Sequence, residues 1–202
     1  MKRTVSIICL LTLICLSFVS CNTGASDDVY SKLNKLMDSS VYNYLEVTVT
    51  TTIDAQTELN STYTYTKSDD GLKIEYSVEN LGQFEQVGGA WVAPDEMITT
   101  AVGSVTVKDG AIVSSEGDDA PFDMKDAALP HFDFKEVYFK SPVSEDGHFT
   151  ASVLSPGAFM GTYSPCSAMT VDVLYHEFTI TDILLTYVSP EGNVVEAKYE
   201  YR

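Results

Sequence analysis

The chain has 202 residues and a formal net charge of −17, from 29 acidic and 12 basic side chains. A surface of this charge repels nucleic acid and anionic lipid headgroups, which excludes nucleic acid as a partner. The charge favours cationic partners or divalent ions; the alternative is that it serves solubility alone. The length predicts a single domain with a core that needs no disulfides.

The first 20 residues predict an export signal. Lys2 and Arg3 precede an uncharged, mostly apolar run over residues 5–19. A transmembrane helix needs about 20 apolar residues, so this run is short for a membrane span but suits the hydrophobic region of a signal peptide. We therefore expect residues 1–20 to be removed from the mature protein.

The end of this segment resembles the lipobox of bacterial lipoproteins. Ser20 is followed by Cys21 and then by the polar run 22–26, although Phe18 and Ser20 stand where the box prefers Leu and Ala or Gly. The resemblance implies that a diacylglycerol is attached to the Cys21 thiol and that cleavage occurs just before it. The alternative is an ordinary cleaved signal with a chance cysteine. We expect a lipid-anchored protein on the extracytoplasmic side of the cell membrane.

Cleavage before Cys21 would remove Lys2 and Arg3 but no acidic residue, so the formal charge would change from −17 to −19. The tether between the cysteine and the first expected helix is only five residues long, 22–26. At about 3.5 Å per residue it reaches at most about 17 Å, which keeps the domain 27–202 close to the bilayer.

Four cysteines occur in the chain, and two of them, Cys9 and Cys15, lie in the expected signal. With Cys21 blocked by lipid, Cys166 has no partner left, so no intramolecular disulfide is predicted. Cys166 with His176 could form a nucleophile and base, but an inert, buried thiol is the better interpretation because Cys is often buried.

Residues 27–38 are predicted to form an amphipathic helix. An aspartate at position 27 or 28 can cap its N-terminus, and its apolar side chains recur at helical spacing. The resulting stripe consists of Val29, Leu33, Leu36 and Met37. We expect it to pack on the domain rather than to bind a partner.

After Ser40 the apolar period changes to two, which is typical of half-buried strands. Asp-Gly pairs at 70–71, 109–110 and 146–147 lie between alternating runs and predict β-hairpins. Gly88-Gly89 is a weaker signal of the same kind. About nine strands follow the helix, most joined by short turns. The predicted fold is mainly β (α+β): an antiparallel meander with one dry face.

Two stretches interrupt the strands. Residues 117–134 predict an acidic loop with one helical turn, and 154–165 predict a short helix with Ser155 at its N-cap and Pro156 at its first position. The second stretch is expected to expose Phe159 and Met160. The carboxylates in and beside the first could hold Ca²⁺, but they lack EF-hand spacing, so no metal is predicted; they are Glu116, Asp118, Asp119, Asp123 and Asp126.

No catalytic motif is present. His131, His148 and His176 are isolated in the sequence, and a zinc-protease motif starting at His176 fails because Ile180 replaces the second histidine. We therefore predict neither an enzyme nor a cofactor. Trp91, the only tryptophan, could line a ligand cavity or cap the core.

The lipidated cysteine, the short tether, the amphipathic helix and the meander ending in Tyr199–Arg202 are together similar to the LolA/LprG-like lipoproteins and lipoprotein carriers. The similarity lies in the order of elements over most of the mature chain. It implies a curved antiparallel half-barrel with helices covering its concave face, and a cavity for acyl chains beneath them. Residues 156–161 would then be a natural lid.

Three functions are compatible with these features. The leading prediction is a membrane-anchored, non-catalytic lipoprotein that binds a lipid or another hydrophobic ligand between sheet and helices. Its cavity candidates are Leu33, Leu36, Met37, Trp91, Phe159 and Met160. The alternative is a structural or protein-interaction lipoprotein with a filled core. An envelope hydrolase ranks third.

Replacement of Cys21 by Ala is expected to release the protein from washed membranes without unfolding it, because the anchor provides the stable attachment. Fractionation of cells, followed by immunoblotting of both fractions, measures the release. A Cys21→Ala variant that stays with the washed membranes would show that the lipobox interpretation is wrong.

Overall fold

The computed structural model describes residues 27–38, 42–54, 57–82, 85–93, 95–122, 128–161 and 166–202. The expected signal peptide, Cys21 and the tether lie outside these residues. No helix in these described ranges combines the length and the apolar character that a membrane crossing requires.

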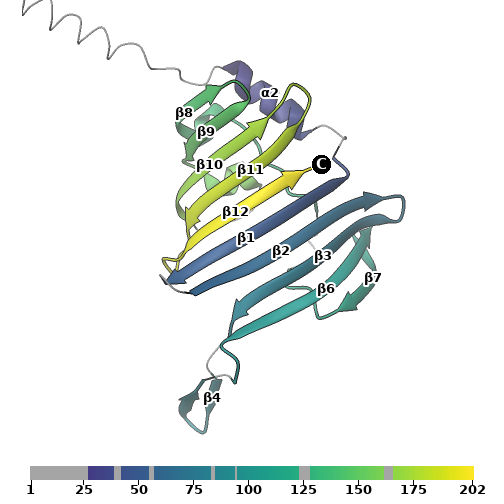
Figure 1. Cartoon of the computed structure of the whole chain (residues 1–202), viewed down its shortest axis with the longest axis vertical. Helices are drawn as coiled ribbons and strands as arrows, with labels where there is room; N and C mark the ends of the chain where they lie inside the picture. Colours follow the sequence, from purple (N-terminus) through teal and green to yellow (C-terminus); the bar gives the residue numbers. More distant parts are fainter. Residues whose placement is uncertain are drawn as a thin grey trace, which may run out of the picture.

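Twelve strands are formed by the described residues. Their bounds are β1 Tyr44–Asp54, β2 Thr57–Ser68, β3 Gly71–Leu81, β4 Glu85–Val87, β5 Ala90–Val92, β6 Ile98–Lys108, β7 Ala111–Gly117, β8 Phe139–Glu145, β9 His148–Val153, β10 Ser167–Tyr175, β11 Ile180–Val188 and β12 Val194–Tyr201. Ten of them form one open antiparallel sheet in the order β7-β6-β3-β2-β1-β12-β11-β10-β9-β8 (Figure 1). The prediction of a mainly-β, antiparallel fold is confirmed.

The strand order corrects the prediction of about nine strands in a simple meander. β1 pairs with β12 along eight residue pairs, from Leu45 opposite Tyr201 to Thr52 opposite Val194. The sheet is therefore two meanders joined through the first and last strands, with β7 and β8 at opposite edges. The short strands β4 and β5 form a separate two-stranded sheet across the predicted Gly88-Gly89 turn.

The predicted hairpin turns are confirmed. β2 and β3 pair across Asp70-Gly71, and two further hairpins have consecutive positive φ angles: 52° and 76° at Asp109 and Gly110, and 35° and 86° at Asp146 and Gly147. Positive φ at both central residues is the geometry of a type I′ turn, whose twist matches that of the strands it joins.

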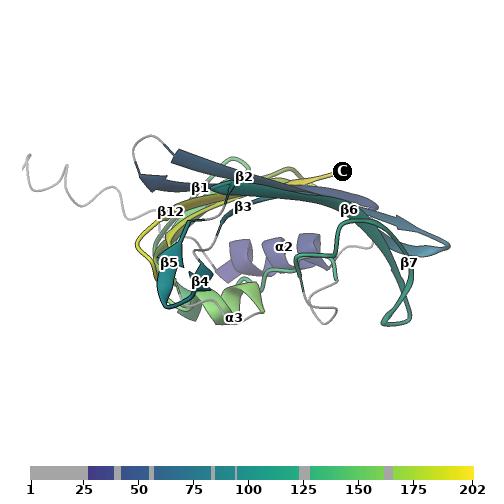
Figure 2. The ribbon, with the colours of Figure 1, turned by 90° about the horizontal axis from the view of Figure 1, so that it is seen from below.

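In the described residues three helical segments accompany the sheet: α2 Asp27–Met37, the 3₁₀ turn η2 Glu136–Tyr138, and α3 Pro156–Met160. α2 and α3 lie on the same side of the sheet (Figure 2), which is called the covered face below. Between β7 and β8 the chain must pass from one edge of the sheet to the other. This crossing segment, residues 118–138 without the undescribed 123–127, also contributes to the covered face.

The larger of two hydrophobic cores lies between α2, the crossing segment and strands β8 to β12 with β1. Aromatic rings dominate it: the Phe132 and Phe159 centroids are 5.2 Å apart, and those of Phe139 and Phe149 are 5.4 Å apart. α2 contributes five side chains that are at most 8% exposed, Val29, Tyr30, Leu33, Leu36 and Met37. Asn34 ties α2 to the crossing segment, since its side chain accepts from Phe134 N at 2.8 Å and donates to Phe134 O at 2.6 Å.

The smaller core lies under β3 and β6 and consists of Ile74, Tyr76, Val78 and Val105. Phe122 of the crossing segment packs against it, with its ring centroid 5.8 Å from that of Tyr76. Tyr76 Oη donates to the carbonyl oxygen of Asp118, which fixes the chain as it leaves β7. The larger core is thus covered by α2 and the crossing segment, whereas the smaller core is covered by the crossing segment alone.

α3 differs from its prediction in one respect. Ser155 and Pro156 occupy the expected N-cap and first helical positions. Phe159, however, is 0% exposed rather than at the surface, because it packs against Phe132, Phe134 and Phe139. Met160 is half-buried against the same core.

Leu33→Ala is expected to lower the free energy of unfolding by about 2–5 kcal/mol, because it leaves a cavity where a fully buried side chain stood. Leu154→Ala is the matched control: this leucine is 58% exposed, so the same truncation should change stability by about 0.5 kcal/mol or less. Urea denaturation followed by circular dichroism measures both. Equal effects of the two substitutions would contradict the packing described here.

Candidate functional site

The six predicted cavity residues fall in two places. Five of them, Leu33, Leu36, Met37, Phe159 and Met160, belong to the main core or pack against it. Trp91 is instead 70% exposed on β5, in the separate two-stranded sheet. The structure therefore brings the helix residues together and leaves Trp91 apart from them.

A cavity of about 330 Å³ lies at the C-terminal end of α2, between the helix, the crossing segment and the sheet. It is called the helix cavity here. Its lining consists of Met37, Asp38, Tyr42, Lys67, Leu129, Pro130, His131 and Tyr201. Only Met37 of the six predicted residues is among them. The helix cavity lies where the main core ends.

The sheet side of the helix cavity is aromatic. The rings of Tyr42 and Tyr201 are 4.9 Å apart between centroids, and both residues are buried. Tyr42 Oη accepts a hydrogen bond of 2.7 Å from Ile180 N, which holds its ring in place. Tyr201 Oη is buried without a hydrogen-bond partner in the described part of the chain. An unpaired buried hydroxyl is unfavourable, by roughly 1–3 kcal/mol.

The charged groups of the helix cavity lie at its exposed side. His131 Nε2 is 2.9 Å from Asp38 Oδ1, and both side chains are more than half exposed. Lys67 projects from β2, whose backbone is tied at this residue by a 2.9 Å hydrogen bond from Lys67 N to Asn43 O. Apolar and aromatic walls with charges at the rim suit an amphiphile better than a polar substrate.

Tyrosines continue from the helix cavity across the covered face. Tyr63 and Tyr65 of β2 and Tyr187 of β11 are half-buried against the main core, and Tyr199 is buried in it. Burial raises the pKa of Tyr65 to about 12, with a smaller contribution from the neighbouring Tyr63. Burial also raises the pKa of Tyr199 and of Tyr201. These phenols are therefore neutral at physiological pH and offer no catalytic base.

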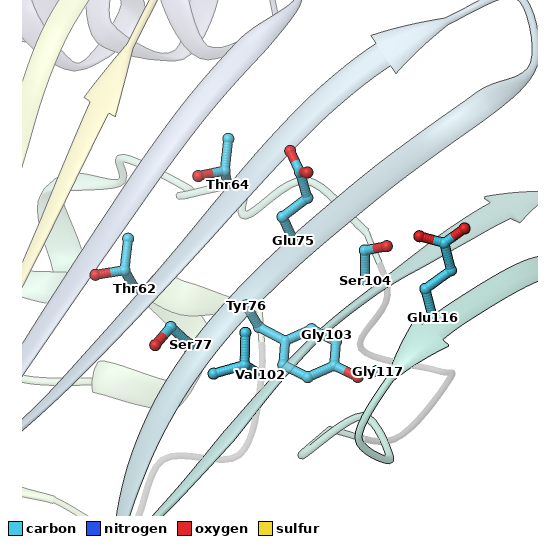
Figure 3. A pocket seen from close by; sticks show the side chains of 10 residues that line it. All are labelled: Thr62, Thr64, Glu75, Tyr76, Ser77, Val102, Gly103, Ser104, Glu116 and Gly117. Carbon is cyan, nitrogen blue, oxygen red and sulfur yellow. The ribbon is translucent and has the colours of Figure 1, made fainter.

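A second hollow, of about 450 Å³, lies on the opposite face of the sheet, because Thr62 and Thr64 alternate along β2 with the inward-facing Tyr63 and Tyr65. Figure 3 shows its lining. Glu75, Ser104 and Glu116 are register partners across β3, β6 and β7, and Glu75 forms a 2.6 Å ion pair with Lys73. Hydroxyls and carboxylates of the sheet line this open-face hollow together with Tyr76 and Val102, and it lies on the face of the sheet opposite α2.

The other candidates from the sequence lie apart. Within the described ranges, no group of three His, Cys, Asp or Glu side chains is arranged to hold a metal ion. Asp118 uses its carboxylate to accept from Val102 N at 2.9 Å, a bond that stabilises the end of β7. Asp123 and Asp126 lie outside the described residues. His148 pairs with Asp172 at 2.8 Å, and Cys166 packs against the main core.

Comparison of the sequence with protein-family models found no match, and comparison with curated proteins found none either.

Sequence reasoning missed most of the helix cavity. Tyr42, Lys67 and Leu129 come from a loop, a strand and the crossing segment, and no spacing in the sequence relates them. The one available signal was Pro130, which disfavours a helix, next to His131 in a segment that otherwise carries core phenylalanines.

Tyr65 gives the protein a predictable response to alkali. The unfolded phenol loses its proton near pH 10 and the folded one near pH 12, so the unfolded state releases the proton first. The contribution of Tyr65 to the free energy of unfolding is therefore fully present below pH 10. It should fall by about 2–3 kcal/mol as the pH rises to 12. Tyr65→Phe should flatten this decline, measured as the urea midpoint against pH. An unchanged slope would contradict the burial of the phenol.

Proposed function

We propose that this protein is a membrane-anchored, non-catalytic lipoprotein of the cell envelope that binds a lipid or another hydrophobic ligand in the helix cavity. The observation that carries the proposal is the position of that cavity, between α2 and the sheet, with tyrosine and aliphatic walls. Its volume of about 330 Å³ lies within the range of about 300–1,000 Å³ that is usual for ligand sites.

The free energy for binding would come mainly from apolar surface removed from water, at about 25 cal/mol per Å². Met37, Leu129 and Tyr201 supply the surface against which an acyl chain would lie. Lys67 and His131 at the rim would face a polar head group.

The arrangement of the layers supports the same proposal. In Figure 2 the β7 end of the sheet bends toward the side on which α2 and α3 lie. The resemblance to the LolA/LprG-like proteins implies a curved half-barrel with an N-terminal amphipathic helix over its concave face, and this bend supports that part of the proposal.

The alternative, a protein-interaction lipoprotein with a filled core, is favoured by one observation. Leu33 and Phe159, two of the predicted cavity residues, are 0% exposed and belong to a core in which aromatic rings are in contact. A ligand that extends beyond the helix cavity would have to displace these side chains. The two functions therefore differ in whether an apolar probe enters beneath α2.

Leu129→Trp is expected to abolish or weaken ligand binding, because the larger ring fills the helix cavity. The probe is a fatty acid with a conjugated tetraene, whose emission rises on transfer from water to an apolar site. The wild-type protein should give saturable binding, and the variant an affinity at least about tenfold lower, which corresponds to about 1.4 kcal/mol.

Leu154→Trp provides the control, since Leu154 is exposed and does not line the helix cavity. It should bind the fatty acid like the wild type and keep the wild-type urea midpoint within the effect expected for a surface change. Leu129→Trp should still unfold in one cooperative urea transition, which shows that it is folded when binding is measured. No saturable binding to the wild type, or equal binding by all three proteins, would contradict the proposed function and favour the interaction lipoprotein.

A further inference from the structure

The hairpin β4–β5 projects beyond the end of β3 and β6, away from the ten-stranded sheet (Figure 1). All its residues are exposed, including three large apolar ones: Val87 at 59%, Trp91 at 70% and Val92 at 47%. Large apolar side chains in water are unfavourable, and these three belong to neither core cluster of the described chain. These three side chains therefore do not stabilise the fold through a hydrophobic core.

The hairpin nevertheless has a defined strand pairing and a defined turn. Gln86 pairs with Trp91 and Val87 with Ala90. The turn between them, Gly88-Gly89, has φ angles of 60° and 87°, which residues other than glycine rarely adopt. An isolated two-stranded hairpin is only marginally stable in water. By the alternation of side chains, Trp91 points to one face of the hairpin, and Val87 and Val92 point to the other. A hairpin that presents large apolar side chains on both faces suggests a surface that is completed by a surrounding partner.

Further exposed apolar side chains lie at the base of the hairpin. Leu81 and Ile98 are paired across β3 and β6, and they are 47% and 40% exposed. Met97 is 46% exposed, and its carbonyl oxygen accepts from Gly82 N at 2.8 Å. The six residues together are called the tip patch: Leu81, Val87, Trp91, Val92, Met97 and Ile98.

Charge separates the hairpin of the tip patch from the rest of the molecule. Residues 86–93 carry no charged side chain, in a chain with a formal charge of −17. The charges that flank this run, at Glu85, Asp95 and Glu96, are all negative. A neutral, apolar tip on an acidic body can enter a region from which the body is repelled.

The size of the tip patch helps to identify the partner. A specific protein interface usually takes about 20–30 residues from each side, several times what this hairpin offers. The interfacial region of a bilayer, in contrast, accepts a small apolar wedge, and tryptophan is enriched at the headgroup level. The acidic flanks disfavour anionic headgroups, which leaves a zwitterionic lipid surface as the matching partner.

We propose that the tip patch inserts into the headgroup region of a zwitterionic lipid bilayer, with Trp91 as its central side chain. This goes beyond the proposed binding of a ligand in the helix cavity, from which it is independent. In Figure 1 the hairpin and α2 lie at opposite ends of the long axis. A lipid anchor before α2 and the tip patch would then hold the domain along the membrane at two points. The contact is small and reversible, so stable attachment still requires the anchor.

Trp91 is the only tryptophan of the chain, so intrinsic tryptophan emission reports on this site alone. The protein for the test is the mature chain 21–202 with Cys21→Ala, which has no anchor. On addition of phosphatidylcholine vesicles its emission should shift to the blue and should be quenched by lipids with brominated chains. The same vesicles doped with anionic lipid should bind more weakly.

Variants show whether the hairpin causes the binding. The double substitution Val87→Ser and Val92→Ser keeps the Trp91 fluorophore. It should lower the vesicle affinity about tenfold or more, because the free energy of transferring two exposed valine side chains from water to the bilayer is lost. Phe178→Ser is the matched control: Phe178 is 75% exposed but lies between β10 and β11, so affinity should not change. Binding of the fatty acid probe should stay as in the wild type in both.

The proposal is overturned if Trp91 emission is unchanged by vesicles of either composition. It is also overturned if the double variant binds like the wild type, or if Phe178→Ser reduces binding as strongly. A blue shift that occurs only when an envelope protein is added, and never with lipid, would identify a protein as the partner instead. None of these results bears on the helix cavity, which the fatty acid titration tests separately.

Discussion

The pairing of β1 with β12 is the contact on which the rest of the structure depends. It brings the two ends of the domain together at the middle of the sheet, where Tyr44 N donates to Arg202 O at 3.1 Å and Arg202 N to Tyr44 O at 3.0 Å. With both ends at the centre, β7 and β8 must occupy opposite edges. The chain between them therefore has to cross the sheet. That crossing segment brings Phe122, Phe132 and Phe134 to the covered face, where they close the two cores.

The two cores differ in what covers them, and the helix cavity lies at the margin of the larger one. α2 and the aromatic rings of the crossing segment pack densely over strands β8 to β12, whereas Phe122 and Ala120 pack over β3 and β6. Met37, the last residue of α2, and Leu129 both reach the space at the end of the helix. A site at the end of a packed helix can admit a ligand at lower energetic cost than one beneath its centre, since fewer core contacts are lost. This is the physical reason to place ligand binding there rather than at Leu33.

Sequence reasoning succeeded where the determining interactions are local. The Asp-Gly turns and the period of two gave the antiparallel hairpins, because turn geometry and side-chain alternation involve neighbours in the chain. It could not find the β1–β12 pairing or the crossing segment, which depend on contacts between distant residues. The same reason explains Phe159, expected at the surface and found at 0% exposure: three phenylalanines from elsewhere in the chain bury it. Trp91 was expected at a cavity or the core, but its hairpin is a local structure that ends outside both.

The central claim is that an apolar ligand occupies the space at the end of α2, and native mass spectrometry of residues 21–202 with Cys21→Ala tests it most directly. The protein would be purified gently from cells and sprayed without detergent. The account predicts a population whose mass exceeds that of the chain by a lipid or another hydrophobic compound, which is released at higher collision energy. A single mass equal to that of the bare chain, from preparations that retain native folding, would contradict the claim.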